Sequence, residues 1–100
     1  MLHHIVLFAL DGFDSPEHKA AHLVQVKEAL EGLPALIPAL RGMSVELNEN
    51  ASEAFDFALC AQVDSLATLP DYADHPEHQR LVRELIKPYL KARACVDYTR

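Results

Sequence analysis

Basic residues are scarce in this sequence, tryptophan is absent, and no hydrophobic run is long. Nine Lys and Arg residues against 15 Asp and Glu residues give a formal net charge of −6. Nucleic-acid-binding proteins need a dense basic face and anionic membranes attract basic segments, so we expect neither kind of partner. The apolar run from Ile5 to Leu10 is too short to span a bilayer and lacks the flanks of a signal peptide. We therefore expect a cytoplasmic location.

Cysteine is equally scarce, and Cys60 and Cys95 form neither a CxxC pair nor a zinc-ligand pattern. Each lies in an apolar, strand-like run, where a buried thiol behaves as a small hydrophobic side chain. The chain has 100 residues, half of them apolar, and no repeat or linker divides it. A single domain with one core, spanning residues 1–100, is therefore predicted.

The pattern of apolar and turn-forming residues predicts strands at residues 3–10, 43–47, 55–63 and 92–98. Ser15-Pro16-Glu17 is a typical helix start and Gly32 a typical helix end, so a first helix is expected between them. A second helical region should begin at Ser65, be interrupted around residues 70–76, and bend or break near Pro88. For the first helix, the expected apolar positions are Ala21, Leu23, Val24 and Leu30.

This order, β-α-β-β-α-β, is the ferredoxin-like arrangement, an α+β fold with a four-stranded antiparallel sheet. Its central strands are usually the first and third, which are the two most apolar here. The first strand is apolar on both faces, because Ile5 and Leu7 alternate with Val6 and Phe8. Helices cover only one face of such a sheet, and a second copy of the sheet is the simplest cover for the other. We therefore predict a homodimer through sheet-to-sheet packing.

Chemically active side chains are concentrated between Asp71 and His78 and again at Asp97. Asp97 lies in an apolar strand, so its burial would require a partner, and a histidine is the natural one. A carboxylate bonded to His78 would fix the imidazole tautomer and leave the other nitrogen free to accept a proton. Tyr72 could then donate to a carbonyl or enolate oxygen. Such a group suits proton abstraction next to a carbonyl.

Less specific roles remain open for the same residues. His78 could lie on a helix surface, and Tyr72 could be a buried tyrosine with a satisfied hydroxyl. His75 precedes Pro76, where its ring is expected to bond to a nearby carbonyl and so pin the helix start.

Two further groups have spacings that a metal site could use. His18 and His22 lie four residues apart on the first helix, but no Glu-containing zincin motif accompanies them, so a solvent-exposed face is expected. Asp71, Asp74 and Glu77 are expected to support helix starts rather than to bind magnesium. Neither a metal nor another cofactor is predicted.

Four strings follow one another along the chain: His4-Ile5-Val6-Leu7-Phe8, Ile37-Pro38-Ala39-Leu40, Asp71-Tyr72 with His75-Pro76-Glu77-His78, and Val96-Asp97-Tyr98. In this order they resemble the stress-responsive A/B barrel domain family. The resemblance covers essentially the whole chain. It implies a dimeric α+β barrel in which each subunit has a cavity between its sheet and its helices.

The resemblance extends to olivetolic acid cyclase, a plant enzyme that closes a linear polyketide by aldol condensation. By this resemblance, the catalytic His and Tyr of the cyclase match His78 and Tyr72, and the carboxylate that orients the His matches Asp97. An N-terminal pocket histidine matches His4, whereas a second one is replaced by Phe57. The bulky aromatic residues of its first helix have no counterpart here, so its substrate is not carried over.

Three functions are consistent with these observations. The first is binding of a small carbonyl or aromatic molecule in a cavity lined by His4, Phe57, Tyr72, His78 and Asp97. The second is a cofactor-free enzyme, similar to polyketide cyclases, isomerases or monooxygenases, that uses His78, Tyr72 and Asp97 as acid–base groups. The third is a structural or stress-protective role without catalysis.

Overall fold

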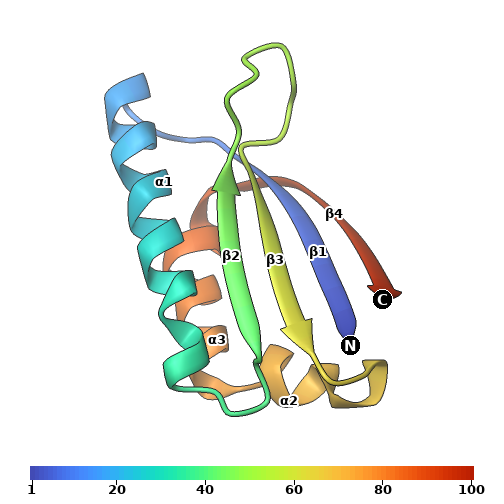
Figure 1. Ribbon diagram of the computed structural model, residues 1–100. Helices are drawn as coiled ribbons and strands as arrows, with labels where there is room; N and C mark the ends of the chain where they lie inside the picture. Colours follow the sequence, from blue (N-terminus) through green and yellow to red (C-terminus); the bar gives the residue numbers. More distant parts are fainter.

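The computed structural model describes all 100 residues as one antiparallel sheet with helical segments on one of its faces (Figure 1). The main elements are β1 (Leu2–Leu10), α1 (Pro16–Glu31), β2 (Gly42–Leu47), β3 (Phe57–Val63), α2 (Leu69–Ala73), α3 (Pro76–Leu81) and β4 (Leu90–Thr99). The sheet order is β2-β3-β1-β4. This confirms the ferredoxin-like fold and its central first and third strands.

Helix α1 begins and ends where the sequence predicts. The Ser15 hydroxyl accepts a hydrogen bond of 3.0 Å from the backbone N–H of His18, and Pro16 occupies the first helical position. At the other end, the backbone N–H of Gly32 donates to the carbonyl of Ala29. Both ends therefore satisfy backbone groups that a helix terminus leaves unpaired.

The apolar face expected for α1 is wrong in part, because Leu30 is buried and Leu23 packs against the core, whereas Ala21 and Val24 are exposed. The residues of α1 that are buried are His22, Val26 and Leu30, spaced four apart, whereas Val24 is 46% exposed. Val24 lies two residues from both His22 and Val26, which turns it to the opposite side of the helix. The buried face includes a histidine because its Nε2 bonds to the carbonyl oxygen of Leu85 at 2.7 Å.

The second helical region is divided into short segments. Its first break falls between α2 and α3, where the His75 ring accepts a hydrogen bond of 3.1 Å from the N–H of Glu77 and so caps α3. The predicted role at the helix start is confirmed, but the partner is a backbone N–H and not the expected carbonyl. Pro70 causes no break, because it lies in the first turn of α2. Beyond α3 the chain forms a π turn (Val82–Ile86) and then a 3₁₀ turn (Lys87–Tyr89) that contains Pro88. The predicted irregularity near Pro88 is thus confirmed.

The two faces of the sheet differ in their cover. Val6, Val45 and Leu59 on the helix-covered face are almost completely buried. On the other face no element covers the side chains, and Val96 and Tyr98 remain 63% and 41% exposed. Neither cysteine is fully buried, contrary to expectation, because Cys60 is partly exposed and Cys95 exposed.

Strand β4 lies at the edge of the sheet beside β1, and its ten residues are exposed along the whole strand. Helix α1 packs against β2, the strand at the opposite edge of the sheet, so the helical cover over β4 is thin (Figure 1). No helix of the structure is both long enough and apolar enough to cross a membrane.

Candidate functional site

A cavity of about 530 Å³ lies between the helix-covered face of the sheet and the segments from α2 to β4. This volume falls within the range of about 300–1,000 Å³ that is usual for small-molecule sites. Val6, Phe8 and Leu59 contribute an apolar wall from β1 and β3. The polar side chains of the lining include His4, Tyr72, His78, Cys95 and Asp97.

Tyr72 lies on α2 with only 1% of its surface exposed, and its hydroxyl has no hydrogen-bond partner. Its ring lies 4.5 Å from that of His78 and 6.3 Å from that of His4, between ring centres. Burial strongly raises the pKa of the Tyr72 hydroxyl, so the group stays protonated and can donate. A buried hydroxyl without a partner is unusual in a folded protein and calls for a missing acceptor.

His78 projects from α3 into the same cavity. Its Nδ1 lies 2.9 Å from the carbonyl oxygen of Ala73. A carbonyl oxygen can only accept, so Nδ1 carries the hydrogen and Nε2 keeps its lone pair. Burial lowers the pKa of His78, and the bond to Ala73 offsets only part of this effect. The imidazole is therefore neutral at neutral pH, with Nε2 able to accept a proton.

The carboxylate of Asp97 bonds to His4, not to the expected His78. His4 on β1 and Asp97 on β4 are register partners, and His4 Nδ1 lies 2.5 Å from Asp97 Oδ1. His78 could donate to Asp97 only through its protonated ring nitrogen, and this nitrogen, Nδ1, donates to the carbonyl of Ala73 instead. The expectation that a histidine partners Asp97 is thus confirmed, but the residue is a different one. Because the carboxylate accepts, Nδ1 of His4 donates and its Nε2 also remains free.

Cys95 adds a thiol to this pair, because it lies two residues before Asp97 and on the same side of β4. Its Sγ is 3.6 Å from His4 Nδ1 and 3.8 Å from Asp97 Oδ2. The three side chains are the only group of His, Cys, Asp and Glu residues close enough to share a metal ion. Their nitrogen, sulfur and oxygen donors are of the kind that zinc accepts. Sequence spacing missed them because His4 and Cys95 are 91 residues apart.

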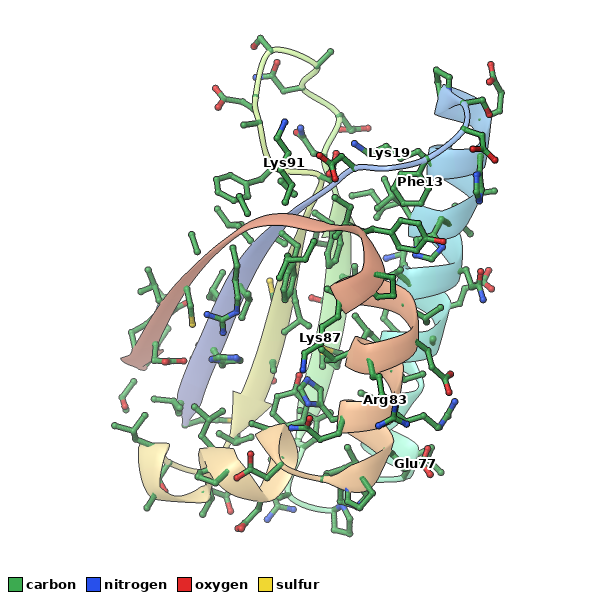
Figure 2. The ribbon with its side chains drawn as sticks, turned by 180° about the vertical axis from the view of Figure 1, so that it is seen from behind. Phe13, Lys19, Glu77, Arg83, Lys87 and Lys91 are labelled. Carbon is green, nitrogen blue, oxygen red and sulfur yellow. The ribbon has the colours of Figure 1, made fainter.

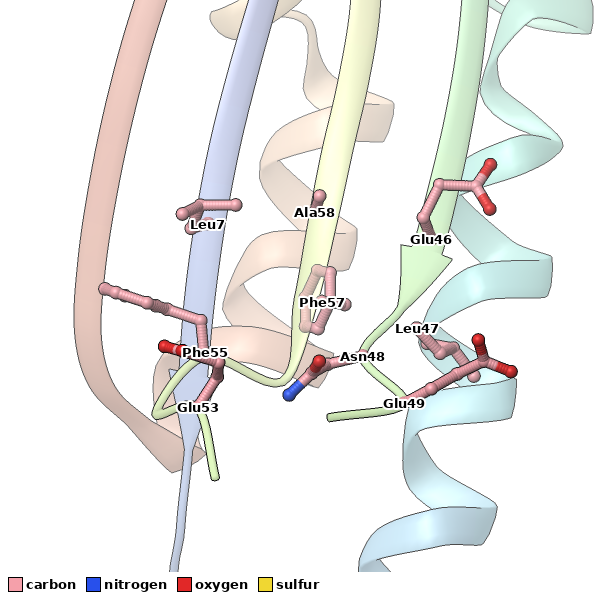
Figure 3. A pocket seen from close by; sticks show the side chains of 9 residues that line it. All are labelled: Leu7, Glu46, Leu47, Asn48, Glu49, Glu53, Phe55, Phe57 and Ala58. Carbon is pink, nitrogen blue, oxygen red and sulfur yellow. The ribbon is translucent and has the colours of Figure 1, made fainter. Parts of the chain in front are cut away.

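Phe57, which was expected in the cavity, does not line it. Its ring is 1% exposed and packs against Phe8, with 5.2 Å between ring centres. Phe57 therefore supports the cavity wall from behind, while Phe8 forms the wall itself. Phe57 instead borders a separate hollow where β2 and β3 meet the loop between them (Figure 3). The side chains around that hollow are Leu7, Glu46, Leu47, Asn48, Glu49, Glu53, Phe55, Phe57 and Ala58.

The first-helix histidines separate into two environments. His18 has 47% of its side chain exposed, as expected, with Asp14 at 4.0 Å. His22, also expected in solvent, is buried beside Phe13 and Tyr89, whose rings stack with 4.3 Å between centres. Its bond to the backbone makes it a structural residue that holds α1 against the segment before β4.

Comparisons with known proteins identify the family. Residues 2–100 match the model of the stress responsive A/B barrel domain. A dimeric ferredoxin-like protein of unknown function from Bacteroides fragilis is 38% identical, with a TM-score of 0.90 over 99% of this chain and 95% of its own. A similar dimeric protein from Thermobifida fusca is 31% identical, with a TM-score of 0.80 over 99% and 90%.

More distant structures include a hydroxynitrile lyase from Passiflora edulis, which is 15% identical, with a TM-score of 0.76 over 97% of this chain and 90% of its own. At this identity the similarity shows the fold alone. No curated protein matches the chain. From the match over residues 2–100, the chain belongs to the stress-responsive A/B barrel domain family.

Proposed function

We propose that this protein is a homodimer that binds a small carbonyl-bearing or aromatic molecule in the cavity beside Tyr72. The observation that carries the proposal is the buried hydroxyl of Tyr72, which has no partner. An unpaired buried donor costs about 1–3 kcal/mol, and a ligand oxygen would remove that cost.

The groups around Tyr72 indicate what such a ligand would offer. Tyr72 donates, so it favours an acceptor such as a carbonyl oxygen. The free Nε2 atoms of His78 and His4 accept, so they favour a hydroxyl or an acidic C–H next to that carbonyl. The walls of Phe8 and Leu59 favour an apolar or aromatic body.

The homodimer is supported by the uncovered face of the sheet. Its side chains include Ile5 and Leu7 at the centre and the exposed Val96 at the edge. An apolar face of this kind usually marks an interface. The relatives from Bacteroides fragilis and Thermobifida fusca are both described as dimeric. Sheet-to-sheet packing would leave the cavity of each subunit open on the helix side.

Calorimetric titration with para-hydroxyacetophenone tests the binding proposal. The native protein should bind this probe, and Tyr72→Phe should weaken binding by about tenfold, because one hydrogen bond is lost from a buried site. The matched control is Tyr89→Phe, since Tyr89 does not line the cavity. If Tyr72→Phe binds as well as the native protein does, the hydroxyl is not the recognition group.

A second function, cofactor-free acid–base catalysis, is favoured by the neutral imidazole of His78 beside Tyr72. In this mechanism His78 Nε2 takes a proton from the carbon next to the carbonyl. The Tyr72 hydroxyl donates a hydrogen bond to the enolate oxygen that forms. Asp97 takes part through His4, whose imidazole it orients, rather than through His78.

Exchange of the methyl hydrogens of acetophenone with deuterated water, followed by proton NMR, tests this second function. Native protein should accelerate the exchange, and His78→Gln should abolish the acceleration. Retained fold and dimer in the His78→Gln variant are checked by circular dichroism and light scattering. A purely stress-protective role would be indicated instead if no probe bound and His78→Gln only lowered the melting temperature. The cytoplasmic location and the lack of a nucleic-acid partner stay predictions from the sequence.

A further inference from the structure

Positive charge is concentrated at the C-terminal end of this acidic protein. Six of the nine Lys and Arg residues lie between residues 80 and 100, together with only two of the 15 acids. Four of the nine cations form ion pairs with acidic side chains. These pairs are Lys19 with Asp56, Lys27 with Glu31, Arg41 with Asp64, and Arg80 with Glu77. None of the other five cations has an acidic partner. The unpaired positive charge therefore lies in the last part of the chain, after α3.

Lys87 and Arg93 are the two unpaired cations that line the cavity. The single acid in the lining, Asp97, is bonded to His4. Lys87 lies in the 3₁₀ turn before β4, and Figure 2 shows its side chain on the side of the helical segment that faces the sheet. Arg93 lies opposite Phe8 across the β1–β4 ladder. Two positive charges thus adjoin an apolar wall.

The backbone positions of both cations are separated along the chain from those of His78 and Asp97. The chain runs along α3 and the turns after it, reverses at Leu90, and returns along β4 (Figure 1). Lys87 follows His78 by nine residues, and Arg93 precedes Asp97 by four. At the usual rise per residue of a helix and of a strand, each of these two separations corresponds to roughly 13 Å along the backbone.

From this arrangement we infer that the ligand is an organic acid, whose carboxylate or phosphate is bound by Lys87 and Arg93 while its carbonyl reaches Tyr72. This inference rests on the proposed function, because it names the class of molecule that the cavity takes. The guanidinium of Arg93 and the ammonium of Lys87 would bind the anionic group of the ligand between them. The apolar walls between them would hold the body of the molecule.

Three probes with the same aromatic ketone separate this inference from simple cavity binding. They are the carboxylate para-acetylhydrocinnamate, the neutral primary amide of the same acid, and para-acetylphenyl phosphate. Calorimetry on the native protein should show that both anions bind about tenfold more tightly than the amide, as for a charge-assisted hydrogen bond, and that the preference shrinks at high salt. The stronger of the two anions identifies the anionic group.

Lys87→Gln and Arg93→Gln should each reduce the preference for the anions over the amide. The matched controls are Arg83→Gln and Lys91→Gln, which remove unpaired cations from outside the cavity and should keep the preference. Equal binding of acid and amide to the native protein, with Tyr72→Phe weakening both, would overturn the inference and leave the proposed function intact. Loss of preference in the controls as well would also overturn it, because general charge would then be the cause. Failure of all three probes to bind would remove the proposed function together with the inference.

Discussion

Replacing Tyr72 by phenylalanine should make the ligand-free protein more stable. The Tyr72 hydroxyl is buried without a partner, so the native state leaves a polar group unsatisfied that water solvates in the unfolded chain. The substitution keeps the ring and its contacts with His78 and His4 and removes only this oxygen. With a typical penalty of about 1–3 kcal/mol for such a group, a gain of about 1 kcal/mol in the free energy of unfolding is a conservative expectation.

For a domain of this size, about 1 kcal/mol corresponds to an increase of roughly 4–8 °C in melting temperature. Differential scanning calorimetry of native protein, Tyr72→Phe and Tyr89→Phe measures this shift. All three are compared at one protein concentration, because dimer dissociation makes the melting temperature depend on it. A lower melting temperature for Tyr72→Phe would show that the hydroxyl is satisfied in solution and would refute the reasoning. A gain in stability together with a loss of ligand binding is the combined signature of a functional hydroxyl.

The remaining predictions concern the helix face, the dimer and pH. Leu30→Ala should lower the free energy of unfolding, measured by urea denaturation, by about 2–5 kcal/mol, because Leu30 is 1% exposed. Val24→Ala should change it by no more than about 0.5 kcal/mol. Similar losses in both variants would show that Val24 faces the core, as expected from the sequence. Val96→Asp should give a monomer in light scattering, since it puts a charge on the uncovered sheet face, while Val24→Asp on the outside of α1 should stay dimeric. Burial lowers the pKa of His78 from its ordinary 6.5, so the folded state binds this proton less readily than the unfolded chain. The stability that neutral His78 contributes is therefore complete above that pH and decreases as the pH falls below it. Urea denaturation at a series of pH values should show that the free energy of unfolding depends less steeply on pH in His78→Gln than in the native protein. An equally steep dependence in that variant would assign the effect to other groups.

Local signals in the sequence were sufficient for the elements and their order. The start of α1 follows from Ser15 and Pro16. The Ser15 hydroxyl accepts a hydrogen bond from a backbone N–H of the first turn, and Pro16 has no backbone N–H that would need a partner. The central strands follow from their apolar residues, since β1 and β3 are the two most apolar strands of the sequence. The two-residue period of a strand puts His3 and His4 on opposite faces of β1, and in the structure His4 lines the cavity while His3 stacks on Tyr98.

Tertiary structure alone decided how the functional groups combine. The sequence contains several histidines near carboxylates, but only the register of β1 against β4 pairs His4 with Asp97 and adds Cys95. The unpaired hydroxyl of Tyr72 depends on which groups surround α2 in space, and no local pattern encodes that. Hydrogen-bond partners far apart in the chain are selected by packing, whereas caps and strand periods act within a few residues. This difference in range is why the sequence determined the fold and the residue types of the site, and why the structure was needed for their arrangement.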